Sequence, residues 1–206
     1  MKEVYGKRNS LIALDGIDQS SKQTQVELLA EKFIQNDYQV KTLTFPDYKT
    51  KLGKLIDNML HDHWDPDVFI RHILFELNRY ESKPVLDWAK KDTIVITDRY
   101  YISGWAYAKA AGLSRLGMNI IKSIDSLLPQ PEFTFILNIK LATSIQRKQK
   151  NRDKFERDME LQRNVIKEFK ELSKIWGWDI INAERKPEDI HKSICRKLSQ
   201  RFPELK

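Results

Sequence analysis

A polar segment near the N-terminus has residue types that could bind the phosphates of a nucleotide. In the segment 15–24, Gly16 follows a short apolar run, and Lys22 lies just before a helical pattern. A glycine-opened loop at a helix N-terminus presents backbone N–H groups and the positive end of the helix dipole to an anion. The lysine adds a positive charge for the outer phosphates. The spacing therefore predicts a phosphate-binding loop.

Two residues depart from the common loop pattern G-x-x-x-x-G-K-[ST]. Ser21 stands in place of the second glycine, so its backbone must adopt a conformation that glycine reaches more easily. Gln23 stands in place of the short hydroxyl residue that normally contacts Mg²⁺. Thr24, Ser20 and a bridging water molecule are the alternatives for that contact. Taken alone, the segment is also compatible with a plain strand–turn–helix that carries a surface lysine.

Apolar runs of strand length alternate with helical patterns along the chain. The five predicted strands are 11–14, 40–45, 93–97, 133–139 and 179–182. Strands that are apolar on both faces and separated by helices form a parallel sheet covered by helices on both sides. In such α/β folds, ligands bind beyond the carboxyl ends of the strands. The residues that follow each strand are therefore the next candidates for a site.

Polar and aromatic residues follow the second and third predicted strands. Phe45 and Pro46 end the second strand, and the segment 98–100, Asp-Arg-Tyr, ends the third. Between these strands, a predicted helix carries Phe75 and Arg79 one turn apart, so both lie on the same helix face. These residues add to the candidate site that the loop begins.

In order and spacing, these motifs resemble those of the thymidylate kinase family, and the resemblance spans nearly the whole chain. The matching segments are 16–18 in the loop, the Phe-Pro pair 45–46, Phe75 with Arg79, the segment 98–100, Ser-Gly-x-Ala-Tyr at 103–107, Leu-Pro-x-Pro at 128–131 and a basic segment at about 143–160. The resemblance implies an enzyme that uses ATP to phosphorylate dTMP to dTDP in deoxynucleotide biosynthesis.

The resemblance also implies a fold and a domain organisation. We expect one nucleoside monophosphate kinase domain over 1–206, with a three-layer P-loop kinase fold. A five-stranded parallel sheet would be covered by helices on both faces, and a small helical lid would lie at about 143–160. The phosphate loop 15–24 would face three acceptor-site segments, 45–54, 75–81 and 98–107.

On the donor side, the resemblance implies that ATP binds to the loop. Lys22 and the loop backbone would hold the β and γ phosphates, and the backbone near Ala183 would line the adenine pocket. Asp98 would organise Mg²⁺, directly or through water, and Thr24 would be a second metal ligand. The residues expected to bind ATP are Gly16, Gln19, Ser20, Ser21, Lys22, Gln23, Thr24 and Ala183.

On the acceptor side, the resemblance implies a dTMP site. Arg99 and Arg79 would bind the acceptor phosphate through bidentate guanidinium contacts, and Phe75 would stack on the base. Asp18 would hydrogen-bond the sugar 3′-hydroxyl, and Tyr107 would crowd the 2′ position so that deoxyribose is preferred. The structural alternatives are core packing for the two rings and internal ion pairs for the arginines. The residues expected to bind dTMP are Asp18, Phe45, Pro46, Phe75, Arg79, Arg99, Ser103 and Tyr107.

One departure affects the acceptor phosphate. Many relatives carry an arginine two residues after the Phe-Pro pair, whereas this chain has Tyr48 followed by Lys49. Either Arg79 and Arg99 bind the phosphate without that arginine, or Lys49 reaches into the site.

The basic segment is expected to supply a cation for the transition state. Charge develops on the oxygens of a phosphoryl group during its transfer, so a nearby cation lowers the barrier. Some family members place an arginine in the phosphate loop, where this chain has Gln19. We therefore assign the catalytic cations to Arg152 and Arg147, with Lys154 in support. A solvated basic helix start is the structural alternative.

Composition limits the other functions. The chain has 206 residues, a net charge of +7 and one cysteine, Cys195. A single cysteine excludes an intrachain disulfide and a multi-cysteine metal site. No apolar run approaches the roughly 20 residues that span a bilayer, so we expect a cytoplasmic protein with no membrane partner. The basic cluster 147–154 lacks the interleaved aromatic residues of single-strand binders, so nucleic acid is not an expected partner.

Other functions compete with dTMP kinase. The first is a kinase for another nucleoside monophosphate or for a deoxynucleoside. The second is a nucleotide-binding pseudokinase whose donor loop is impaired by Ser21 and Gln23. The third, nucleic-acid binding, has the least support. Family habit makes a homodimer the expected assembly.

Overall fold

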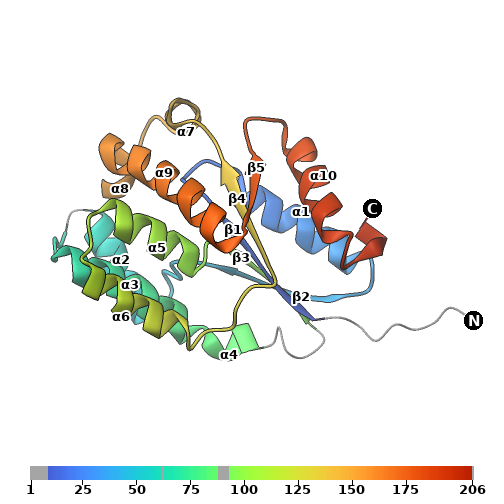
Figure 1. The fold of residues 1–206 in the computed structure, drawn as a ribbon, viewed down its shortest axis with the longest axis horizontal. Helices are drawn as coiled ribbons and strands as arrows, with labels where there is room; N and C mark the ends of the chain where they lie inside the picture. The colour runs from blue at the N-terminus through green and yellow to red at the C-terminus, as the bar shows by residue number, and fades with distance from the viewer. Residues whose placement is uncertain (1–8, 62, 88–92, 206) are drawn as a thin grey trace, which may run out of the picture.

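The protein is described by a computed structural model that covers residues 9–61, 63–87 and 93–205. Its centre is a sheet of five parallel strands in the order β2-β3-β1-β4-β5 (Figure 1). The strands are β1 Ser10–Asp15, β2 Gln39–Thr44, β3 Thr93–Asp98, β4 Phe133–Asn138 and β5 Asp179–Asn182. The α/β class and all five predicted strands are confirmed, and no predicted strand end is wrong by more than one residue.

Helices form a layer on each face of the sheet, as the sequence predicts. α1 and α10 cover one face, whereas α5 and α9 cover the other, where α2, α3 and α6 pack further out (Figure 1). The helices are α1 Lys22–Ile34, α2 Lys51–Leu60, α3 Val68–Glu81, α4 Lys83–Leu86, α5 Tyr101–Ala110, α6 Arg115–Asp125, α7 Leu141–Arg147, α8 Lys154–Arg157, α9 Met159–Trp176, α10 Pro187–Leu198 and the 3₁₀ helix η2 Pro203–Leu205.

Side-chain caps fix the start of two helices that carry site residues. The Asp67 carboxylate accepts hydrogen bonds from the first turn of α3, at Phe69 N and Ile70 N. Asp153 and Glu156 form a reciprocal capping box at α8, which satisfies backbone donors that the helix start leaves free. These caps set where α3 begins and where the short helix α8 of the predicted lid segment begins.

The central strand brings the predicted loop next to the end of β3. In the parallel register, Leu14 lies beside Asp98, and Arg99 N donates to Leu14 O at 2.8 Å. Strand β4 lies on the other side of β1, so the chain direction across the sheet reverses at β1. Ligands of open α/β sheets bind at such a position. The sheet therefore brings residues 15–24 and 98–100 to a common edge.

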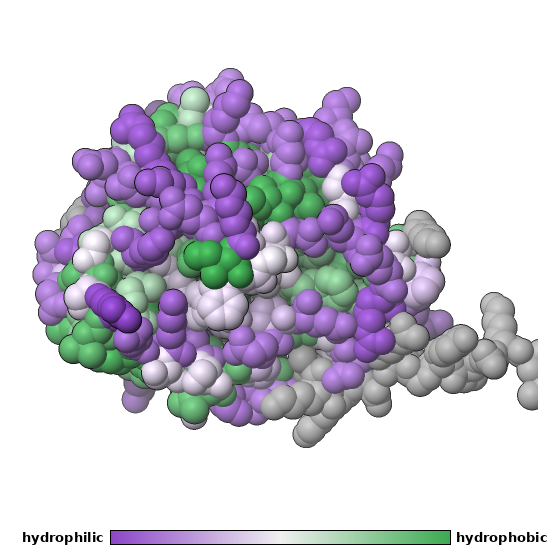
Figure 2. Space-filling view, viewed as in Figure 1, coloured by the Kyte–Doolittle hydropathy of each residue, from purple (hydrophilic) through white to green (hydrophobic). Residues whose placement is uncertain are grey.

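The face of the molecule drawn in Figure 2 is mainly hydrophilic. Figure 2 shows polar side chains over most of one face, with apolar side chains in separate small areas. Among the described residues, none of the helices combines the length and apolar character that crossing a bilayer requires.

Candidate active site

The segment after β1 forms a tight loop that leads directly into α1. Gly16 has a φ of 139°, and a Cβ at this position would collide with the Leu137 carbonyl oxygen. Gln19 and Ser21 also have positive φ values, 64° and 71°. Ser21 thus adopts the left-handed conformation expected of the glycine that it replaces. The loop keeps its shape despite this departure from the common pattern.

Lys22 is buried inside this loop. Its Nζ donates to Ile17 O at 2.9 Å and to Gly16 O at 3.2 Å, and it lies 3.5 Å from Ser20 Oγ. Burial, followed by repulsion from Arg99, lowers the pKa of Lys22 to about 8. Ser20 itself is fully buried. The lysine is therefore held by carbonyl oxygens at the loop, where a phosphate group could take their place.

An outer cavity of about 400 Å³ opens over the loop. Of the residues predicted to bind ATP, Gly16, Ser20 and Ala183 do not line it. Gly16 and Ser20 belong to the loop, and Ala183 O accepts a hydrogen bond from Arg147. Asp98 lines the cavity together with Lys22. The lining residues are Asp18, Gln19, Ser21, Lys22, Gln23, Thr24, Thr44, Phe45, Pro46, Tyr48, Asp98, Arg99 and Arg147.

Arg147, at the end of α7, reaches from the lid to the loop. Its Nη1 donates to Gln19 O at 2.8 Å, and its Nη2 donates to Ala183 O at 3.3 Å. Arg152 lines neither this cavity nor the inner one described below, and its Nε and Nη1 are buried without hydrogen-bond partners among the described residues. Lys154 forms an ion pair with Asp65. Of the predicted lid cations, only Arg147 meets the loop.

Arg99 is the centre of a buried polar network. Its Nη2 donates to Asp18 Oδ1 at 2.7 Å, and its Nη1 donates to Gly16 O at 2.9 Å and to Ser103 Oγ at 3.2 Å. The Ser103 hydroxyl donates in turn to the Asp15 carboxylate. Burial raises the pKa of Asp15 to about 6, although Ser103 and Arg99 act in the opposite direction. The network fixes the Arg99 guanidinium between the loop and α5.

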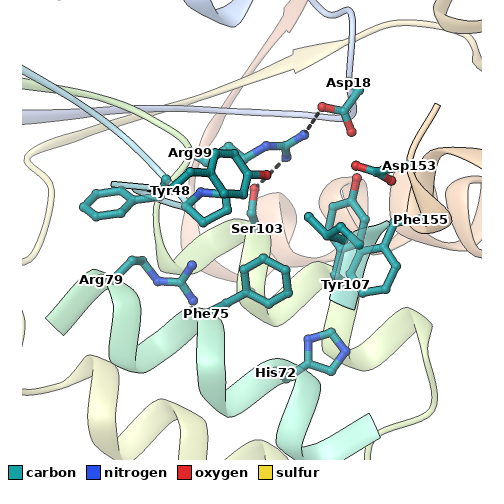
Figure 3. A pocket seen from close by; sticks show the side chains of 14 residues that line it. Asp18, Tyr48, His72, Phe75, Arg79, Arg99, Ser103, Tyr107, Asp153 and Phe155 are labelled. Atoms are coloured by element: carbon teal, nitrogen blue, oxygen red, sulfur yellow. Dashed lines mark hydrogen bonds and ion pairs between the residues drawn. The ribbon is translucent and has the colours of Figure 1, made fainter. Parts of the chain in front are cut away.

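An inner cavity lies behind Arg99, between α3, α5 and the lid (Figure 3). It contains all eight residues predicted to bind dTMP. Phe75 projects into its middle, and Tyr107 stacks on Phe155 of α8 with 5.7 Å between ring centroids. The lining residues are Asp18, Phe45, Pro46, Tyr48, Leu60, His72, Phe75, Arg79, Arg99, Ser103, Gly104, Tyr107, Asp153 and Phe155.

Arg79 borders the inner cavity and is engaged by a neighbouring carboxylate. It lines the inner cavity with Phe75 but not the outer cavity. The side chain is buried and forms an ion pair with Glu76, to which its Nε donates at 3.2 Å. Gly104 packs against this pair so closely that a Cβ would collide with both side chains. The Glu76 carboxylate thus engages the Arg79 guanidinium in this structure, and the contact of Arg79 with the acceptor phosphate stays a prediction.

Several cavity residues were not predicted from the sequence. His72, Asp153, Phe155 and Leu60 line the inner cavity, and Tyr48 lines both cavities, whereas Lys49 lines neither. Asp153 and Phe155 belong to the predicted lid segment, but the local sequence does not indicate that this segment packs against α3 and α5. Tyr48 occupies the position of the missing arginine, and this was the one feature of the sequence that could have indicated its place at the cavities.

The two cavities adjoin, because five residues line both of them: Asp18, Phe45, Pro46, Tyr48 and Arg99. A ligand in the outer cavity and a ligand in the inner cavity would meet at Arg99. Cations that converge between two ligands suit the transfer of a charged group, because they stabilise the negative charge of the transition state.

The outer cavity also has oxygen donors that fit a magnesium ion. Mg²⁺ usually takes one or two protein oxygen ligands and completes its shell with phosphates and water. Asp98 and Thr24 both line the outer cavity, which gives this number of oxygen donors. Within the described ranges, no cluster of three or more His, Cys, Asp or Glu side chains could form a protein-only metal site.

Comparisons with known proteins agree with this geometry. Residues 14–194 match the family model for thymidylate kinase. A thymidylate kinase of Schizosaccharomyces pombe is 33% identical, and the alignment covers 93% of this chain and 92% of that protein. A thymidylate kinase of Danio rerio is 31% identical over 91% of this chain and 89% of that protein.

A solved structure gives the same result for the fold. The structure of a thymidylate kinase from Candida albicans superposes with a TM-score of 0.80 at 25% identity, covering 97% of this chain and 94% of that one. The loop, the paired cavities, the family model and these relatives all agree. The chain therefore belongs to the thymidylate kinase family.

Proposed function

We propose that the protein transfers the γ-phosphoryl group of ATP to dTMP, which yields ADP and dTDP. The observation that carries the proposal is the lining that the two cavities share, which includes Arg99, Asp18 and Tyr48. It would let a donor phosphate in the outer cavity meet an acceptor phosphate in the inner one.

The donor site rests on the loop and on Arg147. The backbone N–H groups of the loop and the Lys22 ammonium would bind the β and γ phosphates. An oxygen of the acceptor phosphate then attacks the γ-phosphorus, and the bond to the oxygen that bridges the β and γ phosphates breaks. Arg147 already contacts the loop at Gln19 O, and its charge would stabilise the transferring group.

Asp98 and Thr24 would hold Mg²⁺ at the outer cavity. When bound, the ion would neutralise charge on the donor phosphates. The shape of the loop, with Lys22 in place, also argues against an impaired donor site in spite of Ser21.

The acceptor site rests on the inner cavity. Phe75 would stack on the base, and Tyr107 would crowd the 2′ position of the sugar. The Arg79 guanidinium only donates hydrogen bonds, so it suits the 4-carbonyl of thymine or uracil and not the 4-amino group of cytosine. The acceptor phosphate would bind Arg99, with the Tyr48 hydroxyl beside it in place of the missing arginine.

We infer a homodimer in the cytoplasm. Leu77 and Tyr80 on α3, and Leu116 and Ile120 on α6, are large apolar side chains with exposed fractions between 38% and 71%. Helices α3 and α6 pack against each other, so burial of these side chains against a second copy would be favourable. Light scattering coupled to size-exclusion chromatography should give twice the monomer mass, and a single-chain mass would overturn the assignment.

A substrate panel tests the proposed reaction. Purified protein is given ATP, Mg²⁺ and one acceptor at a time from dTMP, dUMP, dCMP, dGMP and UMP, and ADP release is measured. We expect the highest kcat/KM with dTMP and lower values with dUMP. Thymidine, which lacks the acceptor phosphate, is added to the panel as a negative control and should not be turned over. Lys22→Ala serves as the inactive control.

Two outcomes would contradict the proposal. A preference for a different monophosphate would assign another kinase activity to the same site. Tight binding of dTMP and ATP without ADP release would indicate a nucleotide-binding protein that does not catalyse the transfer.

A further inference from the structure

His72 of α3 is a buried polar residue to which neither the sequence motifs nor the proposed mechanism gives a role. Its side chain is 1% exposed, and neither Nδ1 nor Nε2 has a hydrogen-bond partner among the described residues. Buried polar groups without partners destabilise a fold, so a natural sequence rarely keeps one unless a ligand or water completes it. The position of His72 indicates which of these applies.

The imidazole lies on the wall of the inner cavity, among aromatic rings. The Phe75 ring lies 6.5 Å from it and the Phe155 ring 6.4 Å, between centroids. Burial, with repulsion from Arg71 and Arg79, lowers the pKa of His72 to about 3. The ring is therefore neutral near pH 7, and it has one donor and one acceptor to offer.

His72, Phe75 and Arg79 follow one another along the same face of α3, with Phe75 in the middle (Figure 3). A planar base stacked on Phe75 would therefore have Arg79 beside one edge and His72 beside another. Arg79 is neutralised by Glu76, so neither polar residue brings an unpaired charge to a neutral heterocycle. A pyrimidine-2,4-dione has a second carbonyl and a ring N–H, and Arg79 alone would leave both without a hydrogen-bond partner.

We propose that His72 is a specificity-determining residue that hydrogen-bonds the edge of the acceptor base away from Arg79. The inference rests on the proposed function, because it assumes that the inner cavity holds the acceptor base. The bound base would then supply the hydrogen-bond partner that no described residue gives to the His72 ring nitrogens. Selection for ligand binding explains why an apolar residue does not occupy this otherwise aromatic wall.

The test replaces His72 with Phe, which keeps an aromatic ring but removes both hydrogen-bonding atoms. Calorimetry measures the Kd of dTMP, thymidine and ATP for the wild type, His72→Phe and His72→Gln, and thermal unfolding gives each Tm. His61→Phe is the matched control, because His61 is exposed at the C-cap of α2 and lines neither cavity.

For His72→Phe we expect dTMP and thymidine to bind more weakly by the same factor, roughly 3- to 10-fold, the contribution of one neutral hydrogen bond. The ATP Kd should stay constant, and Tm should stay equal or rise, because an unsatisfied polar group is removed. His72→Gln retains a donor and an acceptor and should recover part of the affinity. A purely structural histidine would not combine weaker base binding with undiminished stability.

The following results would overturn the inference. Unchanged dTMP affinity in His72→Phe, or a lower Tm together with weaker ATP binding, would assign His72 to packing. If His72→Phe does not fold, His72→Gln decides, and a loss of more than roughly 10-fold there would exclude hydrogen bonding as the role. Failure of the wild type to bind dTMP and thymidine would instead refute the proposed function.

Discussion

Arg99 Nη2 donates to Asp18 Oδ1 at 2.7 Å, and this ion pair joins the end of β3 to the phosphate loop. Burial raises the pKa of Asp18, but the charges of Arg99 and Lys22 outweigh this effect, so the pKa lies below its usual value. Asp18 is therefore ionised near pH 7, and it orients the guanidinium at the junction of the two cavities. The pair therefore holds the Arg99 guanidinium where the two cavities adjoin.

We predict that Arg99→Ala lowers kcat/KM for dTMP by roughly 10²-fold or more, or about 3 kcal/mol of transition-state stabilisation. The variant would lose the cation that faces both ligands and would leave Asp18 unpaired. Steady-state kinetics at saturating ATP measure the effect. Arg196→Ala, an exposed arginine of α10 outside both cavities, is the control and should be unchanged. Near-normal activity of Arg99→Ala would refute its assigned role.

The depressed pKa of Lys22 predicts a pH dependence. In the free enzyme the pKa is about 8, so the ammonium is charged below this value and loses its proton as pH rises through it. The kcat/KM for ATP, which reports the free enzyme, should fall above pH 8. The pH at which kcat falls should be higher, because bound phosphates stabilise the charged form of Lys22.

Lys22→Arg provides the control for this fall in activity at high pH. Arginine remains charged throughout the range, so the residual activity of the variant should show no fall near pH 8. A wild-type profile that stays flat to pH 9.5 would contradict the prediction. Lys22→Ala should lose at least roughly 10²-fold in kcat/KM at every pH.

The lid arginines should differ in their effects. Arg147 contacts the loop at Gln19 O, whereas Arg152 lines neither cavity. We predict that Arg147→Ala lowers kcat by roughly 10²-fold and Arg152→Ala by less than about 3-fold. Single-turnover measurements separate the chemical step from product release. A larger loss for Arg152→Ala would show that the lid rearranges when both substrates bind.

The two departures in the loop should have little effect on turnover. Ser21→Gly removes the cost of a left-handed serine but adds freedom to the unfolded chain, so the unfolding free energy should change by less than about 1 kcal/mol. We predict changes in kcat within about 3-fold for Ser21→Gly and for Gln23→Thr, because the loop is already formed. A gain beyond roughly 10-fold in either variant would reveal an impaired donor site.

Gly104→Ala should impair the acceptor site selectively. The added methyl group would push Glu76 and Arg79 towards the inner cavity. We predict a dTMP KM raised by roughly 10-fold and a stability loss of about 1–3 kcal/mol, with an unchanged KM for ATP. Gly112→Ala is the control: it forces alanine to a φ of 76° in open space, so it should lower Tm without changing either KM. Equal KM values in both variants would contradict the prediction.

Local patterns in the sequence predicted most of the fold. Each strand is a short apolar run between turn residues, and burial on both faces follows from that composition, as in β1. The phosphate loop could also be predicted, because the spacing of Gly16 and Lys22 depends on adjacent residues alone. The same applies to the shared face of Phe75 and Arg79, which follows from helical periodicity.

By itself, then, the sequence determined the sheet, the loop and the residue types of the site. The tertiary structure decided which cations meet the loop, where Arg79 lies, and that His72 and Phe155 line the inner cavity. These outcomes depend on contacts between residues far apart in the chain, such as the ion pair of Lys154 with Asp65 and the packing of Phe155 on Tyr107. Such contacts form because separate elements bury surface against one another, and no local spacing encodes that placement.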